Sequence, residues 1–269
     1  MDITKFMADP NEKPLDNILE NGGFTGVFHT IACIGDSLSS GEWQTRNTDG
    51  TWRYYDMYWY SWGQYIARMT GAAVYNFSRG GMSAEKYMNG FALEKDFWNP
   101  KYAAQAYIVA MGVNDITHIL NGAIEMGSPD DIADNWRDCK KTAIGYYGAM
   151  ILRYKEISPD AKFFLVTQPR DGSPENRSHL QDVQAELLYK IAEKLGSCYV
   201  IDLRKYGPVY DEAFRKMFFL HGHMSPMGYQ LTAKMIASYI DYIIRNNPEE
   251  FLRVGFFGTD IVDHPENGQ

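Results

Sequence analysis

Short apolar runs alternate with longer amphipathic segments along this chain, and that alternation constrains the fold more than any other feature of the sequence. Runs with the length and composition of buried strands occupy residues 31–35, 73–77, 106–111, 162–167 and 198–202. Apolar residues recur at helical spacing in residues 61–70, 131–157, 175–195 and 226–246. Strands that alternate with helices build a parallel sheet with helices on its faces. The sequence therefore predicts an α/β fold with a five-stranded parallel sheet.

The two ends of the chain are less regular than its centre. Residues 1–29 contain two prolines and a Gly-Gly pair, and we expect an irregular lead-in that packs on the body or pairs protomers. Residues 247–269 are too apolar for a free tail, so we expect them to dock on the body or on a neighbouring subunit. A chain of 269 residues is within the size of one large α/β unit, and we expect a single domain over residues 1–269.

The charge balance narrows the classes of partner. Acidic residues outnumber basic residues by 34 to 26, which gives a net charge of -8 and a pI near 5.3. A net negative charge disfavours nucleic acids and anionic membranes as partners. No uninterrupted apolar stretch is long enough for a membrane span. We expect neither partner, and association into a homo-oligomer stays open.

Cysteine usage and the N-terminal residues bear on the compartment. Cys33, Cys139 and Cys198 are scattered in apolar surroundings, which predicts buried free thiols rather than disulfides or a thiolate metal site. The N-terminal residues lack a basic segment followed by an apolar one, the pattern of an export signal. We therefore expect a cytoplasmic protein, with a trimmed export signal as the alternative.

A serine follows the first apolar run directly. The run ends at Gly35-Asp36-Ser37-Leu38, where the glycine permits a tight turn. Open α/β sheets bind ligands beyond the carboxyl ends of their strands, so Ser37 is a candidate nucleophile. The same residue types also form an ordinary turn, and the interpretation therefore depends on the rest of the chain.

Three further motifs lie where a catalytic serine needs partners. Gly81 follows the second predicted strand and Asn114 the third, so a backbone N–H and an amide are available to stabilise negative charge on a carbonyl oxygen. His223 precedes the last predicted helix and can activate a serine near neutral pH. Each motif also has a structural explanation: a glycine turn, a helix cap or a surface histidine. Their joint occurrence favours the catalytic interpretation.

In this order the four motifs resemble those of the SGNH or GDSL-type serine hydrolases, over residues 31–246. Ser37 matches the nucleophile block, Gly81 the glycine block, Asn114 the asparagine block and His223 the histidine block. The resemblance implies a three-layer α/β/α flavodoxin-like fold and hydrolysis of carboxylic esters through an acyl-enzyme. It also implies an oxyanion hole formed by Ser37, Gly81 and Asn114. No metal and no organic cofactor is implied.

The chain departs from the family pattern at one position. Family members usually carry an aspartate three residues before the histidine, and Leu220 stands there in this sequence. A triad acid orients the imidazole and stabilises its charged form, so another group is needed for that role. The sequence leaves several candidates open: a backbone carbonyl of residues 219–221, Asp202, Asp211 and Glu212. His221 is a further candidate for the base itself, although its spacing to Gly228-Tyr229 does not fit the family.

Aromatic residues gather directly after the nucleophile motif. Trp43, Trp52 and Tyr54 lie among polar residues, and we expect them in a loop that binds substrate beside Ser37. Arg79 follows a predicted strand and either binds an anionic substrate group or forms a structural ion pair. A polar loop with aromatic rings suits a small-molecule or oligosaccharide ester, and we expect an acetylated carbohydrate.

Two other functions stay open. An esterase or thioesterase directed at lipids would need an apolar acyl channel, for which the sequence offers Met82, Met88, Phe91, Met111 and Met224. A catalytically inactive module that binds a carbohydrate or a partner would be compatible with the missing aspartate.

Overall fold

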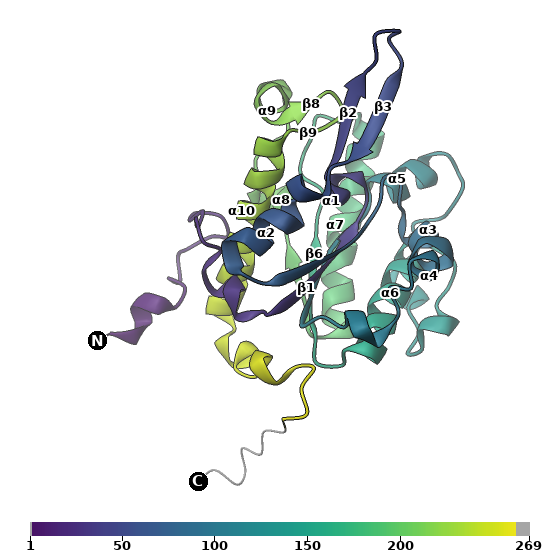
Figure 1. Cartoon of the computed structure of the whole chain (residues 1–269). Helices are drawn as coiled ribbons and strands as arrows, with labels where there is room; N and C mark the ends of the chain where they lie inside the picture. The colour runs from purple at the N-terminus through teal and green to yellow at the C-terminus, as the bar shows by residue number, and fades with distance from the viewer. Residues whose placement is uncertain (1, 262–269) are drawn as a thin grey trace.

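The computed structural model describes residues 2–261 and contains a five-stranded parallel sheet at its centre (Figure 1). Its strands lie in the order β4-β1-β5-β6-β7, and every neighbouring pair is parallel. Their bounds are β1 Thr30–Gly35, β4 Ala73–Ser78, β5 Ala106–Ala110, β6 Lys162–Val166 and β7 Cys198–Ile201. These are the five strands that the sequence predicts, with ends that differ by a residue or so.

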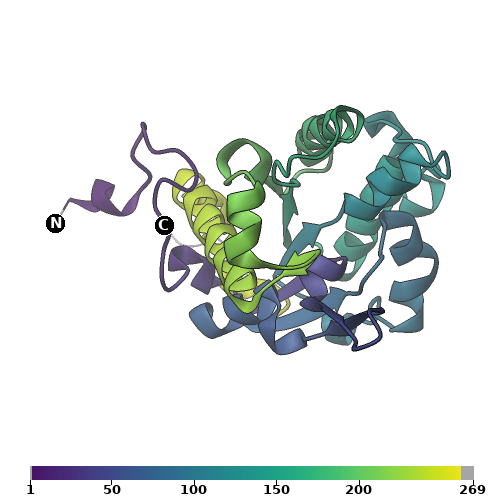
Figure 2. The ribbon, with the colours of Figure 1, turned by 90° about the horizontal axis from the view of Figure 1, so that it is seen from above.

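Helices cover both faces of this sheet, which makes three layers (Figures 1 and 2). Side chains alternate along β1: Ile31 and Cys33 belong to one hydrophobic cluster, and Ala32 and Ile34 belong to the other. Because successive side chains of a strand point to opposite faces, an uninterrupted apolar run is what a strand covered on both faces requires. The predicted α/β/α fold is confirmed.

The helices differ in length and in the face that they cover. Helices α2, α8, α9 and α10 contribute to one cluster, and α3, α4, α6 and α7 contribute to the other. Helical bounds are α1 Ser37–Ser40, α2 Trp62–Thr70, α3 Ala84–Lys86, α4 Ala92–Glu94, α5 Val113–Leu120, α6 Ala143–Ile157, α7 Glu175–Leu195, α8 Leu203–Tyr206, α9 Glu212–Phe218 and α10 Pro226–Asn246. Short 3-10 turns occupy Ile3–Phe6, Gly23–Val27, Tyr58–Tyr60, Pro100–Tyr102, Pro129–Asp131, Trp136–Asp138, Pro248–Phe251 and Val254–Phe256, and a π turn occupies Tyr87–Phe91.

Two segments differ from the sequence-based expectation. The helix predicted over residues 131–157 begins only at Ala143, because the buried Asp131 carboxylate accepts hydrogen bonds from Lys140 and Thr142 and holds the preceding residues in a loop. The expected aromatic loop is instead a projecting antiparallel hairpin of β2 (Glu42–Arg46) and β3 (Trp52–Asp56) (Figure 1). A second, shorter hairpin joins β8 (Phe219–Leu220) to β9 (His223–Met224).

Described residues near both ends of the chain contact the body. In the lead-in, Leu19 N–H donates to Ser238 Oγ at 2.8 Å and Phe24 N–H donates to Asp241 Oδ1 at 2.7 Å, both on α10. In the C-terminal segment, Phe251 is buried against the same cluster. The rest of the predicted extension, residues 262–269, and the first residue of the lead-in lie outside the described residues.

All three cysteines are free, as predicted, but only Cys33 is buried, whereas Cys139 and Cys198 are half-buried. None of the helices between residues 2 and 261 combines the length and the apolar character that crossing a bilayer would require.

Candidate active site

Ser37 lies at the carboxyl end of β1, the strand next to β4 in the sheet, as the first residue of α1. The side chain of Asp36 caps this helix by accepting a hydrogen bond from Leu38 N–H at 3.0 Å. Gly35 lets the helix start close to the sheet, since a Cβ there would lie 2.8 Å from the carbonyl oxygen of Ala110. The turn therefore buries Asp36 and leaves Ser37 half-exposed.

The glycine and asparagine motifs are joined to this turn by hydrogen bonds. After β4, Arg79 N–H donates to the Gly35 carbonyl at 3.4 Å. The side chain of Asn114 donates to the Met82 carbonyl at 3.0 Å and to Asp36 Oδ2 at 3.4 Å. Three strand ends thus meet at one edge of the sheet.

Gly81 lies within the turn that follows β4. Its φ of 74° is in the left-handed region, which favours glycine. The residue is exposed, so its backbone faces the solvent side of the turn.

Two buried carboxyl groups lie beneath these residues. Burial raises the pKa of Asp36 to about 7; the Leu38 N–H opposes this shift, and the neighbouring charge of Asp115 adds to it. Burial likewise raises the pKa of Asp115 to about 6, against the hydrogen bond that its side chain accepts from Ala84 N–H. Burial in the floor of the site therefore makes both carboxyl groups harder to ionise than they are in water.

His223 comes to this edge on β9, which lies beside α1 when the molecule is seen from above (Figure 2). Its Nε2 lies 3.0 Å from Glu42 Oε1, and its Nδ1 lies 3.4 Å from Gln44 Oε1. Both partners belong to β2. Among the described residues, Ser37 and His223 share no hydrogen bond, although catalytic hydrogen bonds often form only once substrate is bound.

The sequence-based candidates for the histidine partner lie elsewhere. Leu220 pairs with His223 across the β8–β9 hairpin and is 41% exposed. Asp202 accepts hydrogen bonds from Thr167, Tyr189 and Lys205 N–H. Asp211 caps α9 through Phe214 N–H, and Glu212 is exposed on that helix. Within residues 2–261, none of these acids, and no carbonyl of residues 219–221, forms a hydrogen bond or ion pair with the imidazole ring of His223.

Glu42 and Gln44 are the residues that sequence analysis missed as partners of His223. In the sequence they are separated from the histidine by about two-thirds of the chain. Their position just after the nucleophile motif was the sequence feature that placed them near the site. Their spacing did contain a signal, because residues i and i+2 of a strand share a face.

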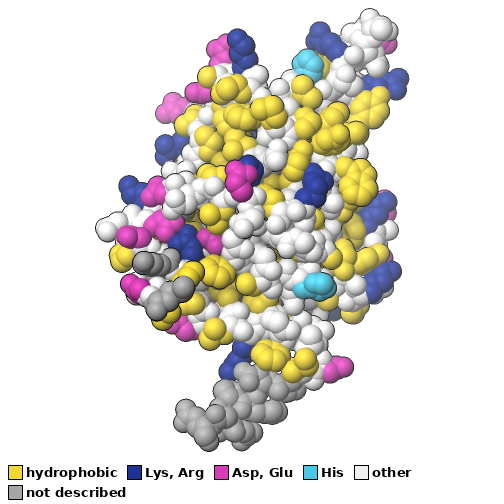
Figure 3. Space-filling model, turned by 60° about the vertical axis from the view of Figure 1, so that its left-hand side comes forward, with side chains coloured by type: hydrophobic (Ala, Val, Ile, Leu, Met, Phe, Trp, Pro, Cys, Tyr) yellow, Lys and Arg dark blue, Asp and Glu magenta, His cyan; other side chains and the backbone are white. Residues whose placement is uncertain are grey.

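The aromatic hairpin divides by face. Trp43 packs inward, with its ring 5.0 Å from that of Tyr60. Trp52 and Tyr54 are 40% and 53% exposed, and their rings lie against His221 and His223 at 4.9 and 5.9 Å. In the space-filling view, hydrophobic side chains gather on the upper part of the molecule, below the tip of the hairpin (Figure 3).

Two other candidates from the sequence, Arg79 and His221, contact neighbouring side chains. Arg79 forms an ion pair with Glu94 at 3.1 Å and lies over the ring of Phe91, which corresponds to the structural alternative. His221 is exposed and packs edge-on against Trp52. Within residues 2–261, no group of three or more His, Cys, Asp or Glu side chains is arranged to hold a metal ion.

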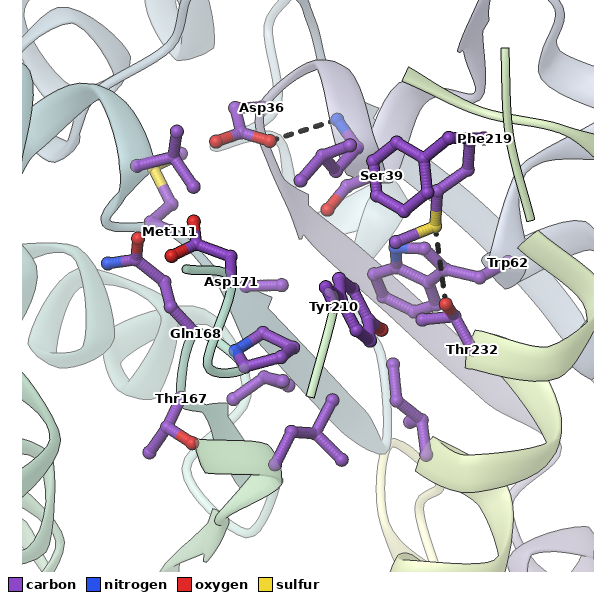
Figure 4. Close-up of a pocket in the computed structure, with 18 of the residues that line it drawn as sticks. Asp36, Ser39, Trp62, Met111, Thr167, Gln168, Asp171, Tyr210, Phe219 and Thr232 are labelled. Atoms are coloured by element: carbon purple, nitrogen blue, oxygen red, sulfur yellow. Dashed lines mark hydrogen bonds between the residues drawn. The ribbon is translucent and has the colours of Figure 1, made fainter. Parts of the chain in front are cut away.

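A cavity of about 200 Å³ lies beneath α1, between the ends of β5 and β6 and helix α10 (Figure 4). Its walls are mainly apolar, and they include Asp36 and Leu38, the neighbours of Ser37 in sequence. Ser37 and His223 are not among the described residues that line it. The buried hydroxyl of Ser39 faces this space without a hydrogen-bond partner.

The chain is similar to known proteins both in sequence and in fold. A family model described as "GDSL-like Lipase/Acylhydrolase family" matches residues 33–231. No curated protein matches the sequence. Solved structures of similar fold include a family two carbohydrate esterase from Clostridium thermocellum in complex with cellohexaose. Its TM-score is 0.54 and its identity 15%, and the match covers 90% of this chain and 67% of that one.

Two further structures have a similar fold. A carbohydrate esterase family 2 enzyme with a carbohydrate binding domain, from Corynascus thermopiles (Myceliophthora fergusii), has a TM-score of 0.53 at 15% identity, over 79% of this chain and 65% of that one. The acetyl xylan esterase AlAXEase has a TM-score of 0.50 at 16% identity, over 78% of this chain and 99% of that one. At these identities the likeness shows the fold alone.

Proposed function

Because the chain belongs to the GDSL-like lipase/acylhydrolase family and is thus a carboxylic ester hydrolase, we propose that Ser37 attacks the ester carbonyl and forms an acyl-enzyme. The observation that carries this proposal is the meeting of three strand ends at one edge of the sheet. There the Gly35 carbonyl and Asp36 side chain of the serine turn bind residues of the glycine and asparagine motifs. Three motifs that are distant in sequence thus meet at the serine turn, and β9, which carries His223, lies beside α1.

In the proposed reaction, His223 Nε2 takes the hydroxyl proton of Ser37 as the oxygen attacks the carbonyl carbon. The N–H groups of Ser37 and Gly81 and the amide of Asn114 stabilise the resulting oxyanion. One amide hydrogen of Asn114 binds the Met82 carbonyl at 3.0 Å, and the other has only a long contact with Asp36, so it is available for substrate. The imidazolium then protonates the leaving alcohol, and water hydrolyses the acyl-enzyme by the same route in reverse.

For the alcohol part of the ester we propose a carbohydrate, and for the acyl part an acetyl group. The exposed rings of Trp52 and Tyr54 beside the histidine loop offer the flat apolar faces against which a sugar ring can pack. Two carbohydrate esterases and an acetyl xylan esterase have a similar fold, which supports this class.

The cavity beneath α1 favours a second candidate, an esterase or thioesterase for longer acyl chains. Its volume of about 200 Å³ exceeds that of a cavity known to bind benzene, roughly 150 Å³, and is far more than an acetyl methyl group needs. Met111 and Met224, two of the residues expected to line an acyl channel, do line it. The other three, Met82, Met88 and Phe91, are not among the described residues that line it, although they pack in the same hydrophobic cluster as Met111.

The test measures hydrolysis of p-nitrophenyl acetate, butyrate and octanoate, and of acetylated oligosaccharides, by the wild type, Ser37→Ala and His223→Ala. We expect both variants to lose activity and the wild type to prefer acetate and acetylated sugars. Preference for octanoate would support the second candidate. Activity that survives in Ser37→Ala would overturn the nucleophile assignment.

A simpler test distinguishes an esterase from an inactive binding module. A fluorophosphonate probe labels only an activated serine, so wild-type protein that stays unlabelled and hydrolyses no ester would identify such a module.

A further inference from the structure

Strand β2 presents two polar side chains to the catalytic histidine. Glu42 and Gln44 are two residues apart on the strand, so they point to the same face, and each contacts one nitrogen of the His223 ring. The family position for the triad acid holds Leu220, which has no polar side-chain atom. The ring is thus held from the hairpin that follows the nucleophile and not from its own loop.

Gln44 meets His223 through its oxygen. Gly222 N–H donates to Gln44 Oε1 at 2.7 Å, and an N–H donor requires that the facing amide atom be the oxygen. The same oxygen lies 3.4 Å from His223 Nδ1, where it accepts a hydrogen bond from a protonated Nδ1. A Cβ on Gly222 would lie 2.4 Å from Gln44 Oε1, so glycine leaves the space that this contact needs.

Glu42 brings a carboxylate to the other nitrogen. Its Oε1 lies 3.0 Å from His223 Nε2, and both side chains are largely shielded, at 14% and 16% exposure. Its second oxygen, Oε2, lies so close to Gly80 that a Cβ added to this glycine would be 2.2 Å from it. Tyr229 anchors the backbone of this residue, since its hydroxyl donates to the Glu42 carbonyl at 2.7 Å and to the Ser37 carbonyl at 3.4 Å.

Both ring nitrogens therefore face acceptor oxygens. A neutral imidazole carries one N–H and can satisfy only one of them, whereas the imidazolium satisfies both. The imidazolium is the form that arises when His223 takes the proton of Ser37. The acceptors at the two ring nitrogens are thus complementary to the charged form of the imidazole.

We propose that Glu42 and Gln44 divide between them the role of the triad acid. Gln44 orients the ring through Nδ1, and Glu42 supplies the negative charge that stabilises the imidazolium. When Nε2 turns to Ser37 in the substrate complex, the carboxylate stays beside the ring and acts through its charge. This inference rests on the proposed function, because it assumes that His223 is the base for Ser37.

The experiment moves the carboxylate on β2 from residue 42 to residue 44. Glu42→Gln keeps the shape and removes the charge, and we expect kcat on p-nitrophenyl acetate to fall by about 10²-fold with KM within about twofold. Adding Gln44→Glu to that variant places a carboxylate at Nδ1, and we expect it to recover at least about tenfold of the lost kcat. Glu42→Asp should retain more activity than Glu42→Gln because it keeps a carboxylate.

Controls separate this inference from the function on which it rests. Glu193→Gln makes the same charge change at an exposed position of α7 and should leave kcat unchanged. Thermal unfolding and the rate of fluorophosphonate labelling, measured on every variant, distinguish loss of catalysis from loss of fold. An inactive Ser37→Ala together with a fully active Glu42→Gln would overturn the inference alone. A double variant no better than Glu42→Gln would also overturn it, and an active Ser37→Ala would overturn the proposed function itself.

Discussion

Asp36 makes the stability of the protein depend on pH in a direction opposite to that of most surface carboxylates. Its pKa rises from the ordinary 3.8 to about 7, mainly through burial. Between these values the unfolded chain has lost the proton while the folded chain keeps it. The ionisable group therefore lowers the free energy of unfolding progressively as the pH rises from about 4 to 7, with no further loss above that range.

Replacement by asparagine removes this penalty and keeps the helix cap. Asparagine caps a helix as well as aspartate does, so Leu38 N–H retains an acceptor. The gap between 3.8 and about 7 corresponds to roughly 4 kcal/mol at pH 8, and to less than about 1 kcal/mol at pH 4. The new amide nitrogen would face Asn114 Nδ2, now 3.4 Å from Asp36 Oδ2, which costs about 1 kcal/mol at every pH.

We therefore expect Asp36→Asn to be neutral or slightly less stable than the wild type at pH 4 and roughly 3 kcal/mol more stable at pH 8. Urea unfolding at pH 4, 6 and 8 measures the difference. Asp134→Asn, an exposed position, provides the control and should give the same small offset at each pH. A difference for Asp36→Asn that stays constant or shrinks as the pH rises would refute the reasoning.

Three further predictions concern the turn, the oxyanion hole and the cavity. Gly35→Ala should lower the free energy of unfolding by about 2 kcal/mol, because its Cβ would lie 2.8 Å from the Ala110 carbonyl; a normal chemical denaturation midpoint would contradict this. Asn114→Ala should lower kcat on p-nitrophenyl acetate by about 10²–10³-fold with little change in KM, and an unchanged kcat would exclude it from the oxyanion hole. Ile236→Phe narrows the cavity and, if that space holds the acyl chain, should lower kcat/KM for octanoate about tenfold relative to acetate. Equal losses of kcat/KM on both esters would show that the acyl chain does not bind in this cavity.

Features that depend on neighbours in sequence were predictable. The five strands follow from apolar runs, and helices α7 and α10 have the predicted bounds. The spacing of apolar residues along the sequence indicates which side chains are buried. Side chains return to the same face after each turn of a helix and after every second residue of a strand. The start of α6 was predicted too early, since the buried Asp131 carboxylate and its partners across the loop decide where that helix begins.

The sequence by itself determined the fold class and pointed to four candidate site residues, Ser37, Gly81, Asn114 and His223, because strand ends and glycine turns are local signals. Only the tertiary structure decided what holds the histidine. Gln44 lies 179 residues before His223, and their contact exists because β2 forms a hairpin that stands beside the β8–β9 loop. The same hairpin turns Trp43 into the core and leaves Trp52 and Tyr54 at the rim. No local pattern specifies which element will pack against a loop so distant in sequence, since that choice is made by the packing of the whole molecule.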